Sequence, residues 1–402
     1  MKTAGIITEY NPLQYGHTAL MRSLRQHYGA DTAIVCAMSG DFVQRGDCAL
    51  VRRHVRAEAA VRSGADLVLE LPLPWAVSSA EGFARGGVET LTAAGLVDVL
   101  AFGSECGDGA ALQRVAAALD SPTLPPLLKE ELHRGDSFAA ARQRAVSPLL
   151  SPADQALLSS PNNTLGIEYC RALRQTGSHA EVFTVPRTGA EHDAAVPDAG
   201  GYSASAIRTL LAEGQREDAL SRMVPAMRTL YEKEEAAGRA PVFSSTCERA
   251  ILARLRSMTA ADFQTLDTGR EGIGQRLYNA SREAASLSAV LDSAKTRRYP
   301  HARLRRMVLW ACLGLTPEDV PGHVPYLRVL AANETGRVLL ARMRKSAAAP
   351  VVTKPAAIRQ LGPEAQRLFR LEARGADLYA LAYPELSAAA GGLLWRQTPV
   401  MV

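Results

Sequence analysis

The sequence predicts an α/β protein in two parts. A Rossmann-like parallel sheet with flanking helices is expected over residues 1–215, and a mostly helical, basic part over residues 216–402. In the first part short apolar runs alternate with helical patterns, the order that right-handed βαβ units produce. After about Gln215 strand signals fade, and stretches rich in Ala, Leu and Arg take over. A chain of 402 residues is long enough for two domains, each with its own core.

Five buried strands are expected in the first part, with helices between them. The strands are Thr3–Thr8, Thr32–Met38, Ala65–Leu71, Val97–Phe102 and Glu181–Val185. The helices are His17–Tyr28, Arg52–Ser63, Ser79–Ala94 and Leu165–Gln175. Strands and helices that alternate at this spacing imply a parallel sheet buried on both faces.

Composition excludes several classes of protein. Hydrophobic residues make up 47% and charged residues 22%, which is ordinary for a globular domain. No uncharged apolar run is long enough to cross a bilayer, and Glu9 and Asn11 interrupt the N-terminal apolar stretch too early for a signal peptide. We therefore expect a cytoplasmic protein with no membrane partner. The six cysteines are scattered without CxxC or zinc-type spacing, so no metal site is expected.

Charge is distributed unevenly along the chain. Residues 1–215 hold 18 Lys and Arg against 23 Asp and Glu, whereas residues 216–402 hold 28 against 18. An acidic part joined to a basic part suggests that the basic part meets a polyanion.

The segment from Lys295 to Arg306 carries the densest positive charge. Its basic residues are Lys295, Arg297, Arg298, Arg303, Arg305 and Arg306, and it has no acidic residue. A solvated helix face usually mixes signs, so the pattern favours a surface that follows RNA phosphates. Tyr299 or His301 would be available to stack on bases, and Arg276 and Arg282 would extend the surface.

The loop after the first expected strand, TEYNPLQYGH, is the first candidate for a ligand site. Ligands of open parallel sheets bind beyond the carboxyl ends of the strands. Gly16 permits close approach of a phosphate, and the helix start at His17 offers free N–H groups and an imidazole to an anion. Neither GxGxxG nor GxxxxGK[ST] occurs, which excludes the common dinucleotide and P-loop sites. Taken alone, the pair Gly16-His17 also fits a plain helix start.

Polar, glycine-containing loops follow the other expected strands. Gly103, after the fourth strand, would admit a flat base or a ribose. Asn162 and Asn163 precede a helix, and Asn163 fits an N-cap as well as it fits a ligand contact. Arg187 ends the fifth strand.

A further helix start follows the fifth strand, in the segment YSASAIRTLL. It contains Ser203 and Ser205, with Arg208 one turn later. Serines here are ordinarily caps, but together with an arginine they form a candidate polyphosphate clamp.

Together these segments resemble the HxGH nucleotidyltransferase superfamily and, more closely, the bacterial tRNA(Met) cytidine acetate ligases. The resemblance is carried by EYNPLQYGH, MSGDFVQRGD, GADLVLELP, FGSECGD, SPNNTLGIEY, VPRTGAEHD, YSASAIR, EGIGQRL and KTRRYPHARLRRM, and it extends through YLRVLAANETGR. It covers residues 5 to about 310 with long ungapped stretches.

The resemblance implies an ATP-dependent ligase that forms acetyl-adenylate from acetate and ATP. The acetyl group would then pass to the exocyclic amine of the wobble cytidine in elongator methionine tRNA. By the same resemblance ATP is held by Gly103, Asn162, Arg187 and the loop residues Ile7, Thr8, Glu9, Tyr10, Asn11, Pro12, Leu13, Gln14, Tyr15, Gly16, His17, Thr18, Ala19 and Leu20. Magnesium is expected to accompany ATP, although the sequence offers no dedicated carboxylate cage for it.

Gln14 departs from the family's motif, because it stands where the first histidine of HxGH is expected. Glutamine donates a hydrogen bond but carries no charge, and losing one such donor costs on the order of 3 kcal/mol. We expect His17 to stabilise the α-phosphate while Arg208 and the backbone near Ser203 hold the departing pyrophosphate. No covalent enzyme intermediate is required.

Two alternatives remain open at this point. A small-molecule nucleotidyltransferase of the same fold would not need the basic helical part. A non-catalytic, ATP-gated RNA-binding relative is suggested by Gln14.

Overall fold

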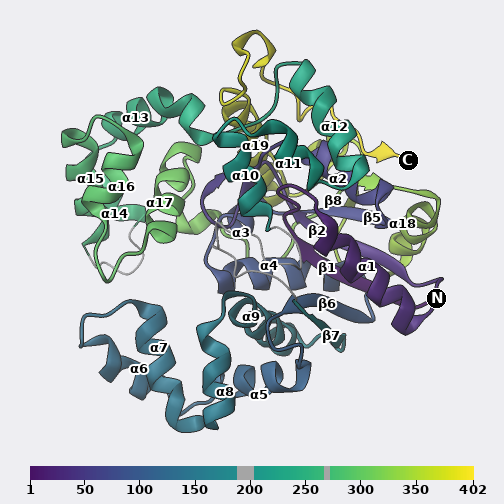
Figure 1. Cartoon of the computed structure of the whole chain (residues 1–402), viewed down its shortest axis with the longest axis horizontal. Coiled ribbons are helices and arrows are strands. Elements are labelled where there is room, and N and C mark those ends of the chain that lie inside the picture. The colour runs from purple at the N-terminus through teal and green to yellow at the C-terminus, as the bar shows by residue number, and fades with distance from the viewer. Residues whose placement is uncertain (188–202, 267–271) are drawn as a thin grey trace.

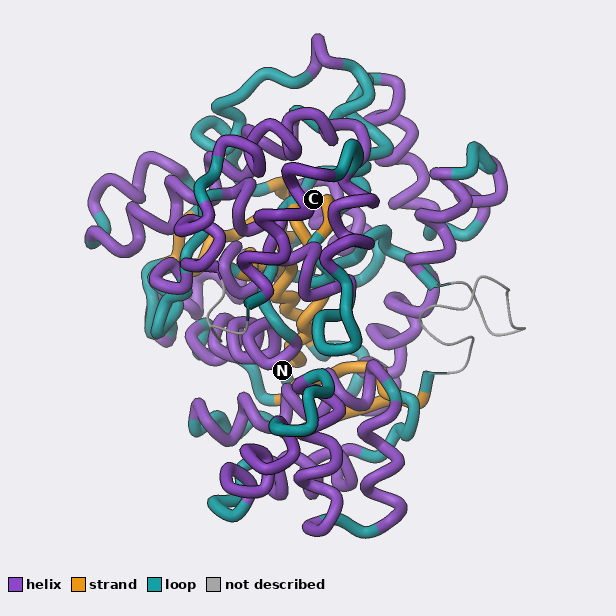
Figure 2. Tube along the Cα trace, turned by 90° about the vertical axis from the view of Figure 1, so that its left-hand side faces the viewer, coloured by secondary structure: helices purple, strands orange, loops and turns teal. Residues whose placement is uncertain are grey.

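The computed structural model describes residues 1–187, 203–266 and 272–402. Figure 1 shows a central sheet with helices on both faces, and a separate group of helices, α13 to α17, standing to its left. Helices dominate the described chain, and Figure 2 shows the strands enclosed among them.

Eight strands form the main sheet, and two short ones form a hairpin. The strands are β1 (Thr3–Thr8), β2 (Ala33–Ser39), β3 (Phe42–Val43), β4 (Asp47–Cys48), β5 (Leu67–Leu71), β6 (Val99–Ser104), β7 (Glu181–Pro186), β8 (Leu327–Ala332), β9 (Val351–Val352) and β10 (Val400–Met401). The main sheet has the order β10-β8-β5-β2-β1-β6-β7, with β9 beside β8, and β3 pairs with β4. All neighbours from β5 to β7 are parallel, as the sequence predicts.

Helices connect the strands and build the rest of the chain. Those up to β7 are α1 (Tyr15–Tyr28), α2 (Arg53–Arg62), α3 (Leu73–Ala76), α4 (Ala80–Ala93), α5 (Gly109–Leu119), α6 (Leu124–Leu132), α7 (Phe138–Val146), α8 (Pro152–Ala156) and α9 (Pro161–Thr176). Those after β7 are α10 (Ala204–Ala212), α11 (Arg216–Ser221), α12 (Pro225–Ala236), α13 (Glu248–Ser257), α14 (Ala260–Leu266), α15 (Ile273–Glu283), α16 (Leu287–Ala294), α17 (His301–Leu313), α18 (Glu334–Ser346) and α19 (Pro363–Ala380). Every strand and helix expected in residues 1–215 is present, with ends that differ by a few residues.

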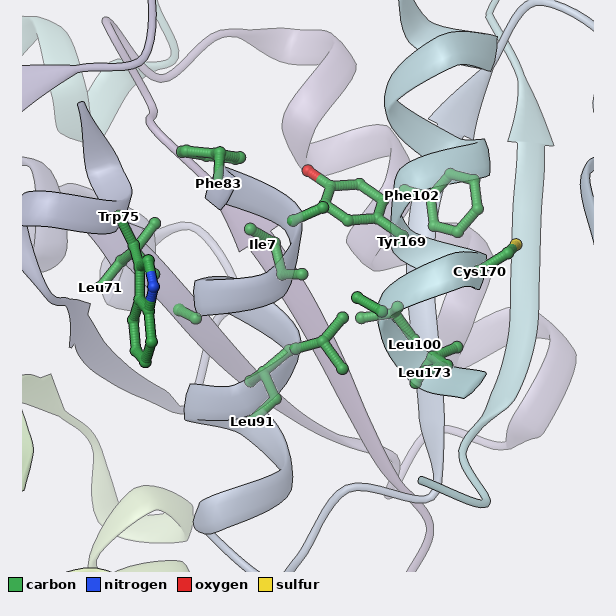
Figure 3. Close-up of a cluster of buried hydrophobic side chains, with 14 of the residues drawn as sticks. Ile7, Leu71, Trp75, Phe83, Leu91, Leu100, Phe102, Tyr169, Cys170 and Leu173 are labelled. Carbon is green, nitrogen blue, oxygen red and sulfur yellow. The ribbon is translucent and has the colours of Figure 1, made fainter. Parts of the chain in front are cut away.

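Alternation along the buried strands divides the core into two layers. In β2, the Val35 side chain belongs to a core cluster with residues of α4, α5 and α9. Cys36 and Met38 belong to a second cluster, with residues of α1, α2 and the helices α10 to α12. Figure 3 shows part of the first layer, where Leu91 of α4 lies near Leu100 and Leu173. Both faces of the sheet are thus covered, which requires nearly continuous apolar strands.

The second part of the chain adds strands that the sequence analysis did not assign. β8 is wholly buried and pairs antiparallel with β5, and β9 and β10 flank it. β8 is a short, mostly apolar run between helical patterns, interrupted by Arg328, and such a run cannot be told from a helix segment by its periodicity. The sheet therefore draws on both sequence ranges, and the division at residue 215 remains a proposal.

The helices α13 to α17 have a hydrophobic cluster of their own. Their largest buried side chains include Phe263 and Tyr299. In the part of the chain that the structure describes, no helix is both long and apolar enough to span a membrane.

Candidate active site

A cavity of about 1010 Å³ lies beyond the carboxyl ends of β1, β6 and β7. From β1 the sheet grows one way through β2 and β5 and the other way through β6 and β7, so the strand order reverses between β1 and β6. Connections leave in opposite directions at such a point and open a crevice. This is the sheet edge where the sequence analysis expects the ligand.

Most residues expected at the ATP site line this cavity. They are Ile7, Thr8, Glu9, Tyr10, Asn11, Gln14, Tyr15, Gly16, His17, Ala19, Leu20, Gly103, Asn162, Arg187, Ser203, Ser205 and Arg208. Four expected residues are not among the lining: Pro12, Leu13, Thr18 and Asn163. Leu13 is a core residue that packs beneath the loop, and the Thr18 hydroxyl donates to the Tyr15 carbonyl.

The first turn of α1 is closed by two of the motif residues. The Gln14 side chain is the N-cap and accepts a hydrogen bond from the backbone N–H of Gly16. His17 reciprocates, because its Nδ1 accepts from the Gln14 backbone N–H at 3.1 Å. An accepting Nδ1 in a neutral imidazole leaves the proton on Nε2, which makes Nε2 a donor. The cap thereby fixes the tautomer whose Nε2–H can donate a hydrogen bond to an anion.

Tyr10 supports this imidazole from below. Its buried ring meets the His17 ring edge-on, with centroids 5.1 Å apart, and its hydroxyl lies 3.3 Å from the Cys36 sulfur. Tyr10 has a φ of 45°, in the left-handed region that non-glycine residues rarely adopt. Such local strain persists only where surrounding contacts fix the backbone, and it is common at ligand sites.

Arg208 connects α10 to the loop after β1. Its guanidinium donates to the Asn11 carbonyl at 2.7 Å and to the Ser205 hydroxyl at 3.3 Å. Ser203 is the N-cap of α10 and accepts from the Ala206 N–H. Burial lowers the pKa of Arg208, while Asp47 and Glu9 oppose that shift. A partly desolvated guanidinium beside a helix N-terminus is suited to an anionic ligand.

Gly103 and Arg187 form another part of the wall. A Cβ on Gly103 would lie 3.0 Å from Cγ of Arg187, so the arginine stem lies over the glycine at the ends of β6 and β7. Flat ligand groups can approach backbone that lacks a side chain. Thr188 to Asp193 of the VPRTGAEHD segment, Tyr202 of YSASAIR and Glu271 of EGIGQRL lie outside the described residues.

Asn162 and Asn163 have different surroundings at the start of α9. The Glu105 carboxylate accepts from the backbone N–H groups of both residues and from the Asn162 side chain at 2.7 Å. Asn163 is buried, and its side-chain oxygen accepts from the Cys106 N–H. It is not the N-cap either, because Ser160 occupies that position. Glu105, which the sequence analysis did not single out, neutralises this helix N-terminus.

Two buried arginines of α2 hold the loops that form the site. Arg56 donates to the carbonyl oxygens of Glu9, Ser39 and Gly40, tying together the ends of β1 and β2. The Arg53 guanidinium donates twice to Oδ2 of Asp41, whose Oδ1 accepts from the Arg53 backbone N–H. The sequence analysis did not assign them a role, because a lone arginine in a helical pattern looks like a solvent-facing residue.

Further residues line the cavity without having been expected there. They are Ile6, Arg22, Ser23, Gln44, Arg45, Phe83, Phe102, Leu165, Tyr169, Val185, Pro186, Ala204, Ser221 and Arg222. Gln44 and Arg45 belong to the quoted loop after β2, so their position was foreseeable from the segment. Ser221 and Arg222 come from beyond residue 215. Their position follows from the packing of α10 and α11, which no local pattern reveals.

The basic segment is divided between exposed and structural residues. Lys295, Arg297 and Arg305 are exposed, and Arg297 also pairs with Asp136 at 2.8 Å. Arg298 and Arg303 are partly buried, the latter with its guanidinium over the Tyr299 ring. Arg306 turns toward the β3–β4 hairpin, where it donates to the Gln44 carbonyl at 3.5 Å.

The expectation for Tyr299 is corrected, whereas those for Arg276 and Arg282 are not tested. Tyr299 is 5% exposed and packs in the core of α13 to α17, so its ring cannot stack on a base. Arg276 donates to carbonyls at the end of α16, and Arg282 donates to the carbonyls of Leu255 and Met258. Both guanidiniums are engaged at helix ends, which positive charge stabilises, yet both residues are exposed, so their part in the phosphate-facing surface stays a prediction.

Comparison with known proteins agrees with this geometry. The family model described as HIGH Nucleotidyl Transferase matches residues 1–391. The chain is 38% identical over 410 residues to the tRNA(Met) cytidine acetate ligase of Syntrophotalea carbinolica, covering 96% of this chain and 95% of the relative. It is 33% identical over 417 residues to that of Acetivibrio thermocellus, covering all of both chains.

Two solved structures have the same fold over their full length. The crystal structure of apo Thermotoga maritima TmcAL superposes with a TM-score of 0.95 at 30% identity and covers all of both chains. The structure of the same protein bound with alpha-thio ATP superposes with a TM-score of 0.93 at 30% identity, again over both whole chains.

Proposed function

The chain belongs to the tRNA(Met) cytidine acetate ligase family of HIGH nucleotidyltransferases, and from this we propose that it is an ATP-dependent ligase that acetylates a cytidine of methionine tRNA. The first half-reaction joins acetate to ATP as acetyl-adenylate and releases pyrophosphate. The second transfers the acetyl group to the exocyclic amine of the wobble cytidine in elongator methionine tRNA and releases AMP.

The observation that carries the proposal is the cavity beside the first turn of α1. Its lining combines the Nε2–H of His17, the guanidinium of Arg208 and the capped start of α10, all suited to a polyphosphate. Displacement at the α-phosphate requires positioning and charge stabilisation more than a protein nucleophile. His17 would bind the α-phosphate oxygens, and Arg208 with the backbone after Ser203 would hold pyrophosphate.

Gln14 can take part in phosphate binding, but as a weaker donor than a histidine. Its side-chain oxygen is engaged with the Gly16 N–H, so the amide nitrogen is the group left to donate toward a phosphate. It brings a neutral dipole where a histidine would bring a charge. The chemical step is expected to be slower, on the order of a hundredfold for one weakened donor.

ATP would enter as its magnesium complex. Within the described residues no group of three His, Cys, Asp or Glu side chains could hold a metal ion. The ion would therefore be held by the triphosphate and water, as Mg²⁺ commonly is at nucleotide sites.

Lys295, Arg297, Arg298, Arg303 and Arg305 would contact tRNA phosphates. Their segment precedes and begins α17, whose Arg306 contacts the loop that carries Gln44. A phosphate-following surface beside the cavity would guide the anticodon toward the adenylate.

Mass spectrometry of tRNA tests the function as a whole. Elongator methionine tRNA is incubated with the protein, ATP and deuterated acetate, and the digested nucleosides are weighed. A labelled acetyl group on the wobble cytidine, dependent on ATP, supports the proposal. ATP hydrolysis without labelled cytidine would refute it.

A further inference from the structure

Acylation of an amine releases a proton, and the cavity must provide somewhere for it to go. Of the described residues that line the cavity, Glu9 is the one with a carboxylate. The ionisable neighbours around it are mostly cationic, as a triphosphate requires. A carboxylate would repel the triphosphate, so Glu9 is not expected to bind ATP phosphates. Its presence among these cations points to a role with another substrate.

Glu9 is held in place from both sides. It directly follows β1, and the Arg56 guanidinium binds its backbone carbonyl. Its side-chain Oε1 accepts a hydrogen bond of 2.7 Å from the backbone N–H of Gln44. No described residue donates to Oε2. One oxygen is thus fixed by the loop after β2 while the other keeps its acceptor capacity.

The surroundings of Glu9 make its carboxylate easier to protonate than an exposed one. Burial raises the pKa of Glu9, and the Gln44 N–H together with Arg208, Arg56 and Arg45 opposes that shift. The Tyr169 hydroxyl also lies near Glu9, and burial together with the Glu9 carboxylate raises the pKa of that hydroxyl. A phenol with a raised pKa stays protonated, which leaves Glu9 to accept a proton.

Apolar side chains adjoin this part of the cavity. Ile7, Phe83, Phe102 and Tyr169 line it and also belong to the core layer between α4 and α9, as Figure 3 shows. Such a wall limits water, which would otherwise hydrolyse an acyl-adenylate.

We propose that Glu9 is the proton acceptor of the acetyl-transfer step. The amine nitrogen of cytidine attacks the acetyl carbonyl carbon and forms a C–N bond. Oε2 of Glu9 takes one amine proton, and the bond from the acetyl carbon to the AMP oxygen breaks, leaving its electron pair on AMP. This inference rests on the proposed function and assigns the step that it leaves open.

Adenylation itself does not use this base. Acetate attacks as an anion and has no proton to lose, so removing the Glu9 charge should affect the two half-reactions unequally. A role in binding magnesium, in contrast, would make adenylation as sensitive as transfer.

The test uses Glu9→Gln, because an amide oxygen can still accept from the Gln44 N–H. Adenylation is measured by acetate-dependent exchange of labelled pyrophosphate into ATP, and by acetyl-hydroxamate formation with hydroxylamine. Transfer is measured in a single turnover with tRNA. General-base catalysis contributes roughly 10²- to 10⁴-fold. We expect transfer to fall at least about 100-fold and at least ten times further than exchange and hydroxamate formation. Glu58→Gln on α2 removes a carboxylate in the same way at a site outside the cavity, where Glu58 is partly buried and pairs with Arg62, and it should leave both half-reactions at the wild-type rate.

The pH profile separates catalysis from a purely structural role. In the wild type the transfer rate should rise with pH as Glu9 loses its proton and then level off, and Glu9→Gln should lack this rise. An equal fall in exchange and transfer, or an unchanged pH profile, would overturn the inference. Absence of acetate-dependent exchange in the wild type would instead refute the proposed function.

Discussion

The Arg208 guanidinium donates a hydrogen bond of 2.7 Å to the carbonyl oxygen of Asn11, 197 positions earlier in the chain. This contact closes the cavity between the loop after β1 and the start of α10. The same guanidinium also reaches the Ser205 hydroxyl. Arg208 therefore shapes the site and supplies its charge.

Replacing Arg208 with Lys should keep the charge and lose the fork of donors. An ammonium group cannot bond Asn11, Ser205 and a phosphate in the same planar arrangement. We expect acetate-dependent pyrophosphate exchange to fall about 10- to 100-fold, with unfolding unchanged within a few degrees. Exchange at more than half the wild-type rate would show that charge alone suffices.

His17→Ala should abolish adenylation without unfolding the protein. The change removes the Nε2–H donor and the acceptor for the Gln14 N–H. Losing a transition-state donor costs roughly 10²- to 10³-fold, whereas losing a cap costs about 1 kcal/mol of stability. Pyrophosphate exchange and thermal unfolding, measured on the same sample, check both parts. Retained exchange would reject the role of His17.

Gln14→His restores the motif and tests the cost of the substitution found in this chain. The histidine Nδ1 could still accept from the Gly16 N–H. Its Nε2–H would be a stronger hydrogen-bond donor than the amide of Gln14. We expect exchange to rise, by up to about 100-fold if the charge is realised. An unchanged or lower rate would mean that the site has adapted to glutamine.

Gly46→Ala should loosen the contact between α17 and the β3–β4 hairpin. A Cβ at Gly46, whose φ is 79°, would lie 2.5 Å from the backbone nitrogen of Arg306. Gly135 is a matched control, because its φ is 76° and nothing lies within 4 Å of its added Cβ. We expect Gly46→Ala to slow transfer to tRNA more than adenylation, while Gly135→Ala changes neither. Equal effects of the two variants would refute the idea that the contact between Gly46 and α17 supports transfer to tRNA.

Arg298→Ala and Arg305→Ala should weaken tRNA binding and leave acetyl-adenylate formation intact. Each removed phosphate contact should also reduce the slope of log affinity against log salt by roughly one. Arg62→Ala on α2, which removes a half-exposed arginine paired with Glu58, is the charge-matched control. Filter binding at several salt concentrations measures the effect. Parallel loss of adenylation would argue against a division of labour between the two parts.

Much of this architecture could be predicted because its signals are local. The five strands from Thr3 to Val185 are buried on both faces and separated by helices, so periodicity and spacing reveal them. The loop ending in Gly16-His17 follows the first of these strands, and position alone made it a candidate. The cavity lies beside it.

The remaining features depend on contacts between distant segments. Tyr299 looked available for a base but is buried under Arg303, and Arg306 looked like a phosphate contact but faces Gln44. The Asn163 side chain accepts from the Cys106 N–H, while Glu105 accepts from the backbone N–H groups at the helix start. Which face of a short polar segment is buried is decided by tertiary packing, and no local pattern contains that information.

The liganded structure provides the most direct test of the central claim, that ATP binds beside the first turn of α1. Crystals soaked with alpha-thio ATP should show the α-phosphate within hydrogen-bond distance of His17 Nε2, with the β- and γ-phosphates toward Arg208 and the start of α10. A triphosphate bound elsewhere, with the cavity between β1 and β6 empty, would contradict the account.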